Sequence, residues 1–89
     1  ALMLSSQNAY LHYDMGNILA ANKEYDEAIK QYNSAININP YLAEAYYNRG
    51  LAYILNGKKA EGVESLSKAG ELGLYDAYSV IKQNSKGAK

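Results

Sequence analysis

The chain contains 89 residues, no cysteine, and nine Lys and Arg residues that balance nine Asp and Glu residues, so its formal net charge is zero. This length allows one small domain, and the lack of cysteine excludes disulfide bonds and thiolate metal sites. The neutral charge argues against a nucleic-acid partner, which would need a basic excess. The longest apolar run, Leu51 to Leu55, is too short to cross a membrane.

The sequence repeats itself with a period of 34 residues. Residues 9–42 align without gaps with residues 43–76, and glycine meets glycine in this alignment. The identical pairs are Ala9/Ala43, Tyr13/Tyr47, Gly16/Gly50, Asn22/Asn56, Glu27/Glu61, Ala35/Ala69 and Tyr41/Tyr75. A period of this length is typical of solenoids, in which stacked helix pairs share a continuous core.

Apolar residues of the first repeat recur at intervals of three and four, which predicts two helices. The first helix covers the apolar residues up to Leu19, and residues 1–8 either extend it or end an earlier helix. The second helix begins near Tyr25, after a polar break at residues 22–24. Pro40 suits a first helical turn and bars the continuation of a preceding helix, so the second helix ends before it.

The second repeat predicts the same arrangement, with helices over about residues 41–56 and 59–72. A turn at Gly57 separates these helices, and Gly73 suits the end of the second one. We therefore divide this part of the chain into a first repeat, residues 9–42, and a second repeat, residues 43–74.

A fifth helix is expected over residues 75–84, followed by a small and polar segment, residues 85–89, that we expect to be a disordered tail. We interpret this helix as a cap of the solenoid, with Tyr75, Tyr78 and Ile81 facing inward. Its alignment with the earlier helices has two solutions. A shift of 34 residues places Ala77 under Ala43, and a shift of 32 places it under Ala45, which we prefer because it also aligns two aromatic residues.

The residue types at fixed positions of both repeats resemble the tetratricopeptide repeat (TPR) family. That family places an aromatic, a large apolar, a small and another aromatic residue on the first helix of each repeat. Alanines, an aromatic residue and a proline follow on the second helix and its exit. The corresponding positions here are His12, Gly16, Leu19, Ala28, Tyr32, Ala35 and Pro40, then Tyr46, Gly50, Tyr53, Gly62, Leu66 and Ala69. The resemblance implies an all-α fold, in which antiparallel helix hairpins stack as a short right-handed solenoid of about five helices.

Small residues are expected where the two helices of each repeat cross. Gly16 should face Ala28 in the first repeat, and Gly50 should face Gly62 in the second. Larger side chains at these positions would overpack the crossing and destabilise the fold.

The resemblance also implies a binding site, because the first helices of successive repeats in this family line a concave groove that holds an extended peptide or a partner helix. The expected groove residues are Tyr10, Tyr13, Asn17, Tyr47, Asn48, Leu51 and Leu55, with Asp14, Ala21 and Glu44 on the same helix faces. Tyrosine rings offer rigid contact area, and an asparagine amide offers a donor and an acceptor to a peptide backbone.

One branch of the family, the chaperone-binding co-chaperones, clamps a C-terminal carboxylate with lysines and asparagines. Asn17 and Asn48 match the two asparagines of that motif, but Tyr13 and Tyr78 stand where two lysines are expected. Lys82 matches the remaining basic position only under the 34-residue shift. Because charge-assisted hydrogen bonds carry such a site, the sequence argues against a carboxylate clamp.

A second interpretation stays open for several of these residues. Asn17 and Asn48 are equally expected as solvated helix residues, and Tyr13 and Tyr47 as residues that pack on neighbouring helices. His12, the only histidine, is expected to pack in the core rather than to catalyse a reaction or bind a metal.

Leu51 and Leu55 are more informative, because apolar side chains on an open face indicate a binding or self-association surface. We therefore expect a protein–protein interaction module with a protein or peptide partner, as part of a larger scaffold or adaptor. The alternative is a self-assembling structural segment that dimerises through its open ends. The sequence predicts no enzyme, cofactor, metal site or catalytic residue. The absence of a signal peptide and of cysteine favours a cytoplasmic location.

Overall fold

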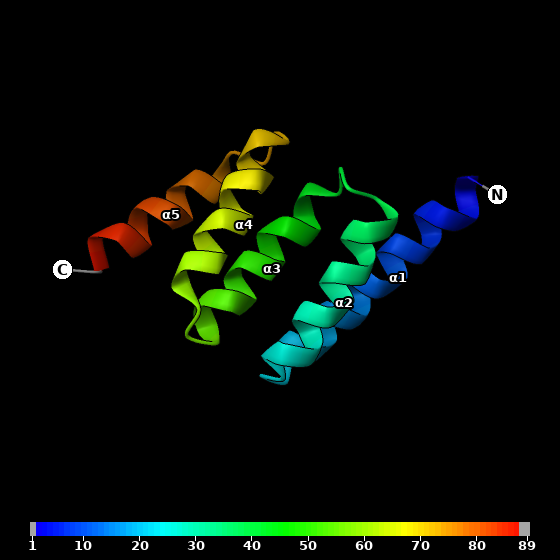
Figure 1. Ribbon diagram of the computed structural model, residues 1–89, viewed down its shortest axis with the longest axis horizontal. Helices are drawn as coiled ribbons and strands as arrows, with labels where there is room; N and C mark the ends of the chain where they lie inside the picture. The colour runs from blue at the N-terminus through cyan, green and yellow to red at the C-terminus, as the bar shows by residue number, and fades with distance from the viewer. Residues whose placement is uncertain (1, 88–89) are drawn as a thin grey trace.

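The computed structural model describes residues 2–87, with side chains for residues 8–84, and the chain in this range folds into five α-helices (Figure 1). They are α1 (Leu2–Ala21), α2 (Tyr25–Ile38), α3 (Ala43–Leu55), α4 (Lys59–Glu71) and α5 (Asp76–Gly87). Each helix packs against the next one along the chain, and α1 also contacts α3. The all-α solenoid predicted from the sequence is therefore confirmed.

The turn between α2 and α3 is longer than expected, and α3 begins at Ala43 rather than near Tyr41. Asn39 has an extended backbone, as residues before proline usually do. Its side-chain oxygen accepts a hydrogen bond of 3.1 Å from the backbone N–H of Tyr41. Pro40 consequently lies in this turn, not in the first turn of a helix as predicted.

The two hairpin turns share one helix-ending geometry. Lys23 and Gly57, which are equivalent in the repeat, both have a positive φ, of 65° and 84°. In each turn the next residue donates a backbone hydrogen bond to the carbonyl five residues before it. The N–H of Glu24 bonds the Leu19 carbonyl at 2.9 Å, and the N–H of Lys58 bonds the Tyr53 carbonyl at 2.8 Å. Such bonds satisfy the carbonyls that a helix end leaves unpaired.

The last helix differs from the expectation in its inward face and its length. Tyr75 is 73% exposed and therefore does not face inward, and Ala77, which was not predicted to, is fully buried. Tyr78 is half exposed, but its ring lies against Gly70 of α4, and Ile81 packs against the buried cluster of Tyr46, Leu66, Ala69 and Ala77. The N–H of Ala77 bonds the carbonyl of Leu74, as that of Ala45 bonds the carbonyl of Leu42. These equivalent bonds agree with the 32-residue alignment.

The predicted disordered tail, residues 85–89, is helical as far as Gly87. No proline interrupts the helix there, so its backbone hydrogen bonds can continue past Asn84. Residues 88 and 89 of this predicted tail lie outside the described residues.

The core lies between consecutive helices, and Tyr32 and Leu66 are its largest fully buried side chains. Gly50 and Gly62 face each other as expected, since a Cβ on Gly50 would lie 2.9 Å from the Gly62 carbonyl oxygen. At Gly16 the three atoms nearest to a Cβ belong to the ring of Tyr32. The large ring of Tyr32 fills the space beside the helix crossing and reaches Gly16 first.

Candidate functional site

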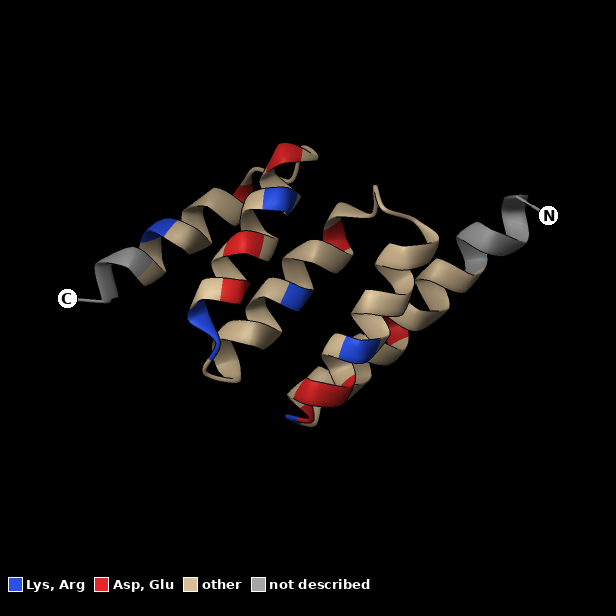
Figure 2. Ribbon diagram, in the orientation of Figure 1, with Lys and Arg blue, Asp and Glu red and all other residues tan. Residues whose placement is uncertain are grey.

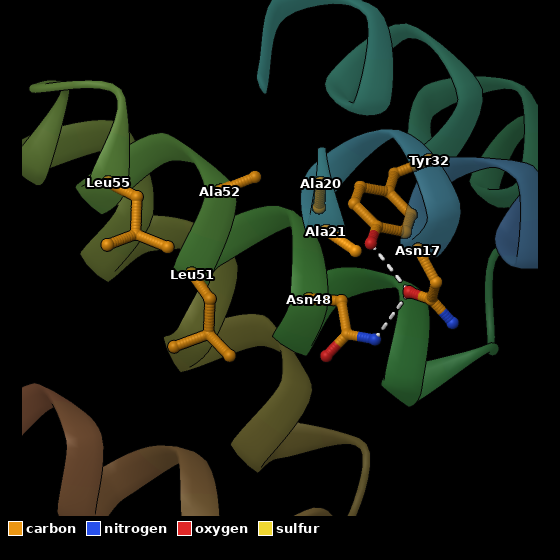
Figure 3. A pocket seen from close by; sticks show the side chains of 8 residues that line it. All are labelled: Asn17, Ala20, Ala21, Tyr32, Asn48, Leu51, Ala52 and Leu55. Atoms are coloured by element: carbon orange, nitrogen blue, oxygen red, sulfur yellow. Dashed lines mark hydrogen bonds between the residues drawn. The ribbon is translucent and has the colours of Figure 1, made fainter. Parts of the chain in front are cut away.

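A groove of about 280 Å³ runs between α1, α2 and α3 (Figure 3). The helices α1 and α3 run in the same direction, with α2 returning between them (Figure 1). The lining residues are mostly small or aliphatic, with two amides and one hydroxyl at one end. They are Asn17, Ala20, Ala21, Tyr32, Asn48, Leu51, Ala52 and Leu55.

Four of the seven predicted groove residues line this cavity, namely Asn17, Asn48, Leu51 and Leu55. Helical spacing explains why they meet, because residues three or four positions apart share one helix face. Leu55 is the most exposed of these residues, at 66%. An exposed leucine beside an apolar cavity offers a surface that a partner can cover.

The three predicted tyrosines are not among the residues that line the groove. Tyr13 turns into the core, where its ring centroid is 6.1 Å from that of Tyr32. Tyr47 packs against the buried cluster that contains Ala77 of α5. Tyr10 is half exposed one helical turn before Tyr13, with the two rings edge to face. Tyr13 and Tyr47 therefore pack against buried clusters, as the packing interpretation of these residues predicts.

Sequence reasoning missed three lining residues, Ala20, Tyr32 and Ala52. Ala20 and Ala52 follow Asn17 and Asn48 by three and four positions, so helical periodicity could have found them. Tyr32 carried no such signal, because it belongs to α2, the second helix of its repeat.

A hydrogen-bond network joins α1, α2 and α3 at one end of the groove (Figure 3). Asn17 Oδ1 accepts a bond of 2.6 Å from the Tyr32 hydroxyl and one of 2.9 Å from Asn48 Nδ2. Asn48 Nδ2 also donates to the Tyr13 hydroxyl at 3.0 Å. The two asparagines are thus bonded to each other and to tyrosines, so the interpretation as merely solvated residues is wrong.

Burial raises the pKa of the Tyr32 hydroxyl to about 12, and the nearby Tyr13 hydroxyl contributes to the same direction. The charged phenolate would lose its hydration in this position. The Tyr32 hydroxyl therefore stays protonated at neutral pH and keeps its hydrogen bond to Asn17.

The helices that border the groove carry few charges, and most charged residues of the described chain lie on α2, α4 and the turns (Figure 2). The described part of α1 has one charged residue, Asp14, and α3 has Glu44 and Arg49. Arg49 bonds to Asn33 of α2 at 2.8 Å and to Ser65 of α4 at 3.0 Å, outside the groove lining. No cation on α1 or α3 therefore lines the groove among the described residues.

A second apolar surface lies on the outer side of α1. Leu11, Met15 and Ile18 are 60%, 47% and 62% exposed, and their spacing places them on one face. A shift of 34 residues maps Leu11 and Ile18 onto Ala45 and Ala52 of α3, which are buried against α2. The outer face of α1 is thus equivalent to the face through which the two repeats pack.

The described residues contain no group of three or more His, Cys, Asp or Glu side chains arranged to hold a metal ion. None of the helices in this part of the chain combines the length and the hydropathy that crossing a bilayer requires.

Two family models match the chain. One, described as TPR repeat, matches residues 16–57, and another, described as Tetratricopeptide repeat, matches residues 43–72. Together they cover α2, α3, α4 and the last six residues of α1, and these segments contain all the residues that line the groove.

Curated relatives match over most of this chain. The Photosystem I assembly protein Ycf3 of Acaryochloris marina is 34% identical over 61 residues, which are 68% of this chain and 37% of that protein. The Hsp70-Hsp90 organizing protein of Triticum aestivum is 41% identical over 59 residues, 66% of this chain and 10% of that protein. The Small glutamine-rich tetratricopeptide repeat-containing protein 2 of Saccharomyces cerevisiae is 29% identical over the whole chain and 26% of its own length. The chain thus spans well under half of the relatives that it matches.

Proposed function

The chain belongs to the tetratricopeptide repeat family, and from this premise we propose that it binds a peptide or a partner helix in the groove between α1 and α3. In this proposal residues 9–42 and 43–74 are the two repeats, and the fifth helix caps them. The module would serve a larger scaffold or adaptor protein. Two of the relatives bear the names of an assembly protein and an organizing protein, which supports a role in bringing proteins together.

The observation that carries the proposal is the combination of an open apolar cavity and a rigid amide pair. Leu51 and Leu55 provide apolar area that a partner side chain would remove from water. Asn17 and Asn48 are held in place by tyrosine hydroxyls, so they lose little conformational freedom when a ligand binds. Pockets with this composition are typical of binding sites.

The test is a selection of random peptides displayed on phage against the immobilised chain, followed by affinity measurements on Leu55→Glu and Leu11→Glu. Both leucines are exposed to a similar degree, 66% and 60%, but only Leu55 lines the groove. We expect Leu55→Glu to weaken binding of the selected peptides about tenfold or more, because it places a charge in an apolar contact. Leu11→Glu should bind them normally.

Equal losses in the two variants, or no enriched peptide at all, would contradict binding in the groove. Circular dichroism of both variants provides the folding control, since each replaces an exposed side chain and should leave the helices intact.

A second candidate function is self-assembly through the outer face of α1. The exposure of Leu11, Met15 and Ile18 favours it, because the equivalent face of α3 is covered by a neighbouring repeat. In this alternative the chain is a structural segment that dimerises through its open end.

A further inference from the structure

The bond between Asn17 and Asn48 limits what the two amides can offer to a ligand. Asn48 Nδ2 uses both hydrogens, on Asn17 Oδ1 and on the Tyr13 hydroxyl. Asn17 Nδ2 is then left as the donor and Asn48 Oδ1 as the acceptor, and Figure 3 shows both atoms pointing away from the shared bond. The pair therefore presents one donor and one acceptor.

This result does not depend on which way the amides are turned. Exchanging N and O in both side chains preserves the bond between them, because the tyrosine hydroxyls can donate or accept. The exchanged pair again leaves one free donor and one free acceptor. A carboxylate only accepts hydrogen bonds, so it would meet the oxygen of one asparagine. A peptide group has one N–H and one C=O, which matches both amides.

Two carboxylates lie on the same side of the groove helices as this pair. Asp14 precedes Asn17 by three residues on α1, and Glu44 precedes Asn48 by four residues on α3, so each acid shares a helix face with an asparagine. Both acids are exposed, and neither forms an ion pair among the described residues. Arg49, the only cation on these two helices in that range, bonds to Asn33 and Ser65 instead. The two carboxylates thus lie about one helical turn beyond the amide end of the groove, outside the residues that line it.

The opposite end of the groove is apolar. Leu51 follows Glu44 by seven residues on α3, which corresponds to about 10 Å along a helix. An extended peptide covers this distance in about three residues. A ligand in a polyproline-like extended conformation repeats its side-chain direction every three residues. Such a ligand contacts both ends when a positive charge and an aliphatic side chain stand about three residues apart.

From these observations we propose that the groove selects an internal, extended peptide segment with a Lys or Arg about three residues from an aliphatic side chain. The basic side chain contacts Asp14 and Glu44, a peptide group bonds to the Asn17–Asn48 pair, and the aliphatic side chain lies between Leu51 and Leu55. The segment is not a free C-terminus. This inference rests on the proposed function, and it specifies which chemical class of peptide the groove binds.

The test compares synthetic peptides that are acetylated and amidated at their ends. Lys and Leu are separated in them by two or three intervening residues, the extended spacing, or by six, the helical spacing. Each spacing is made with Lys before Leu and with Leu before Lys. Matched peptides replace Lys by Glu, or carry a free carboxyl group directly after Leu. Affinities are measured at low and at physiological salt for the unaltered chain and for Asp14→Asn and Glu44→Gln. Glu64→Gln, an exposed carboxylate on α4, is the matched control.

We expect the Lys peptide with extended spacing to bind about fivefold tighter than the Glu peptide at low salt, since exposed charge pairs contribute modestly. Asp14→Asn and Glu44→Gln should each reduce this preference, and Glu64→Gln should keep it. The free carboxyl group should give no gain in affinity.

Tighter binding of the Glu or free-carboxyl peptides would overturn the inference and leave the groove function standing. A preference for six intervening residues would mean that the bound peptide is a helix, because seven residues of a helix span about 10 Å. This outcome would also overturn the inference of an extended ligand. Failure of every peptide, together with a failed phage selection, would count against the groove function itself.

Discussion

Tyr32 connects the core of this molecule to its groove. Its side chain is 1% exposed and its ring lies against Gly16, while its hydroxyl reaches Asn17 at the groove. One residue of α2 therefore fixes both the crossing of the first repeat and the position of a groove amide. A change in Tyr32 is expected to affect stability and binding together.

The raised pKa of Tyr32 predicts a loss of stability in alkaline solution. The unfolded chain releases this proton near pH 10, and the folded chain holds it until about pH 12. The stabilising contribution is therefore complete below pH 10 and is lost as the pH rises towards 12. Urea unfolding at pH 9 and at pH 11.5 should show this decrease in the unaltered chain.

The Tyr32→Phe variant is the control, because it keeps the ring and the other nine tyrosines. We expect it to be about 1 kcal/mol less stable at pH 7, since it lacks the bond to Asn17. Its stability should fall less between the two pH values. An equal fall in both proteins would show that other groups cause the alkaline effect.

At the scale of the elements, helix ends decide the shape of each repeat. Lys23 and Gly57 occupy the same position in the two hairpin turns, and both have a left-handed backbone. Glycine adopts this conformation without steric cost, whereas a lysine is strained by contact of its Cβ with the backbone. The turn of the first hairpin therefore contains backbone strain at Lys23, and the turn of the second hairpin does not, because glycine stands at the equivalent position.

The Lys23→Gly variant is expected to be more stable by about 0.5–1 kcal/mol, because it removes this strain. The lysine side chain is exposed, so its removal costs little packing. Thermal unfolding should shift upward by about 4 °C for a domain of this size. Lys58→Gly is the matched control, since Lys58 is exposed with φ of −109° and gains nothing from glycine. A similar shift in both variants would contradict the strain argument.

At the scale of the whole molecule, helices are stacked in chain order and form an elongated body of 48 × 27 × 15 Å. Contacts join mainly neighbouring helices, as in solenoids, where stability depends on interfaces between adjacent repeats. Among the described residues, Leu11, Met15 and Ile18 on the outer face of α1 are exposed, whereas the equivalent alanines of α3 are buried against α2.

This open face predicts the oligomeric behaviour that would distinguish the two candidate functions. If α1 pairs with a second copy, light scattering behind a sizing column should give a dimer that dissociates on dilution. Leu11→Glu should then yield the monomer of 9.8 kDa, because it places a charge in an apolar interface. Leu55→Glu should leave the dimer intact. A monomer at every concentration would exclude self-assembly and leave the groove as the working site.

The fold could be predicted from the sequence because its signals lie in the spacing of residue types along the chain. Apolar spacing, turn glycines and the 34-residue period marked all five helices, and helical register placed Asn17, Asn48, Leu51 and Leu55 on the groove side. Boundaries were less certain where a side chain competes with the helix, as Asn39 does in the turn before α3.

Only the tertiary structure decided which groups meet across helices. The sequence by itself determined that Asn17 and Asn48 lie on neighbouring first helices, but not that they bond to each other or to Tyr13 and Tyr32. It also could not show that Tyr47 packs against a buried cluster with members on α3, α4 and α5. These contacts join residues 15 to 35 positions apart. They depend on the distance and angle between packed helices, which the periodicity of one helix does not specify.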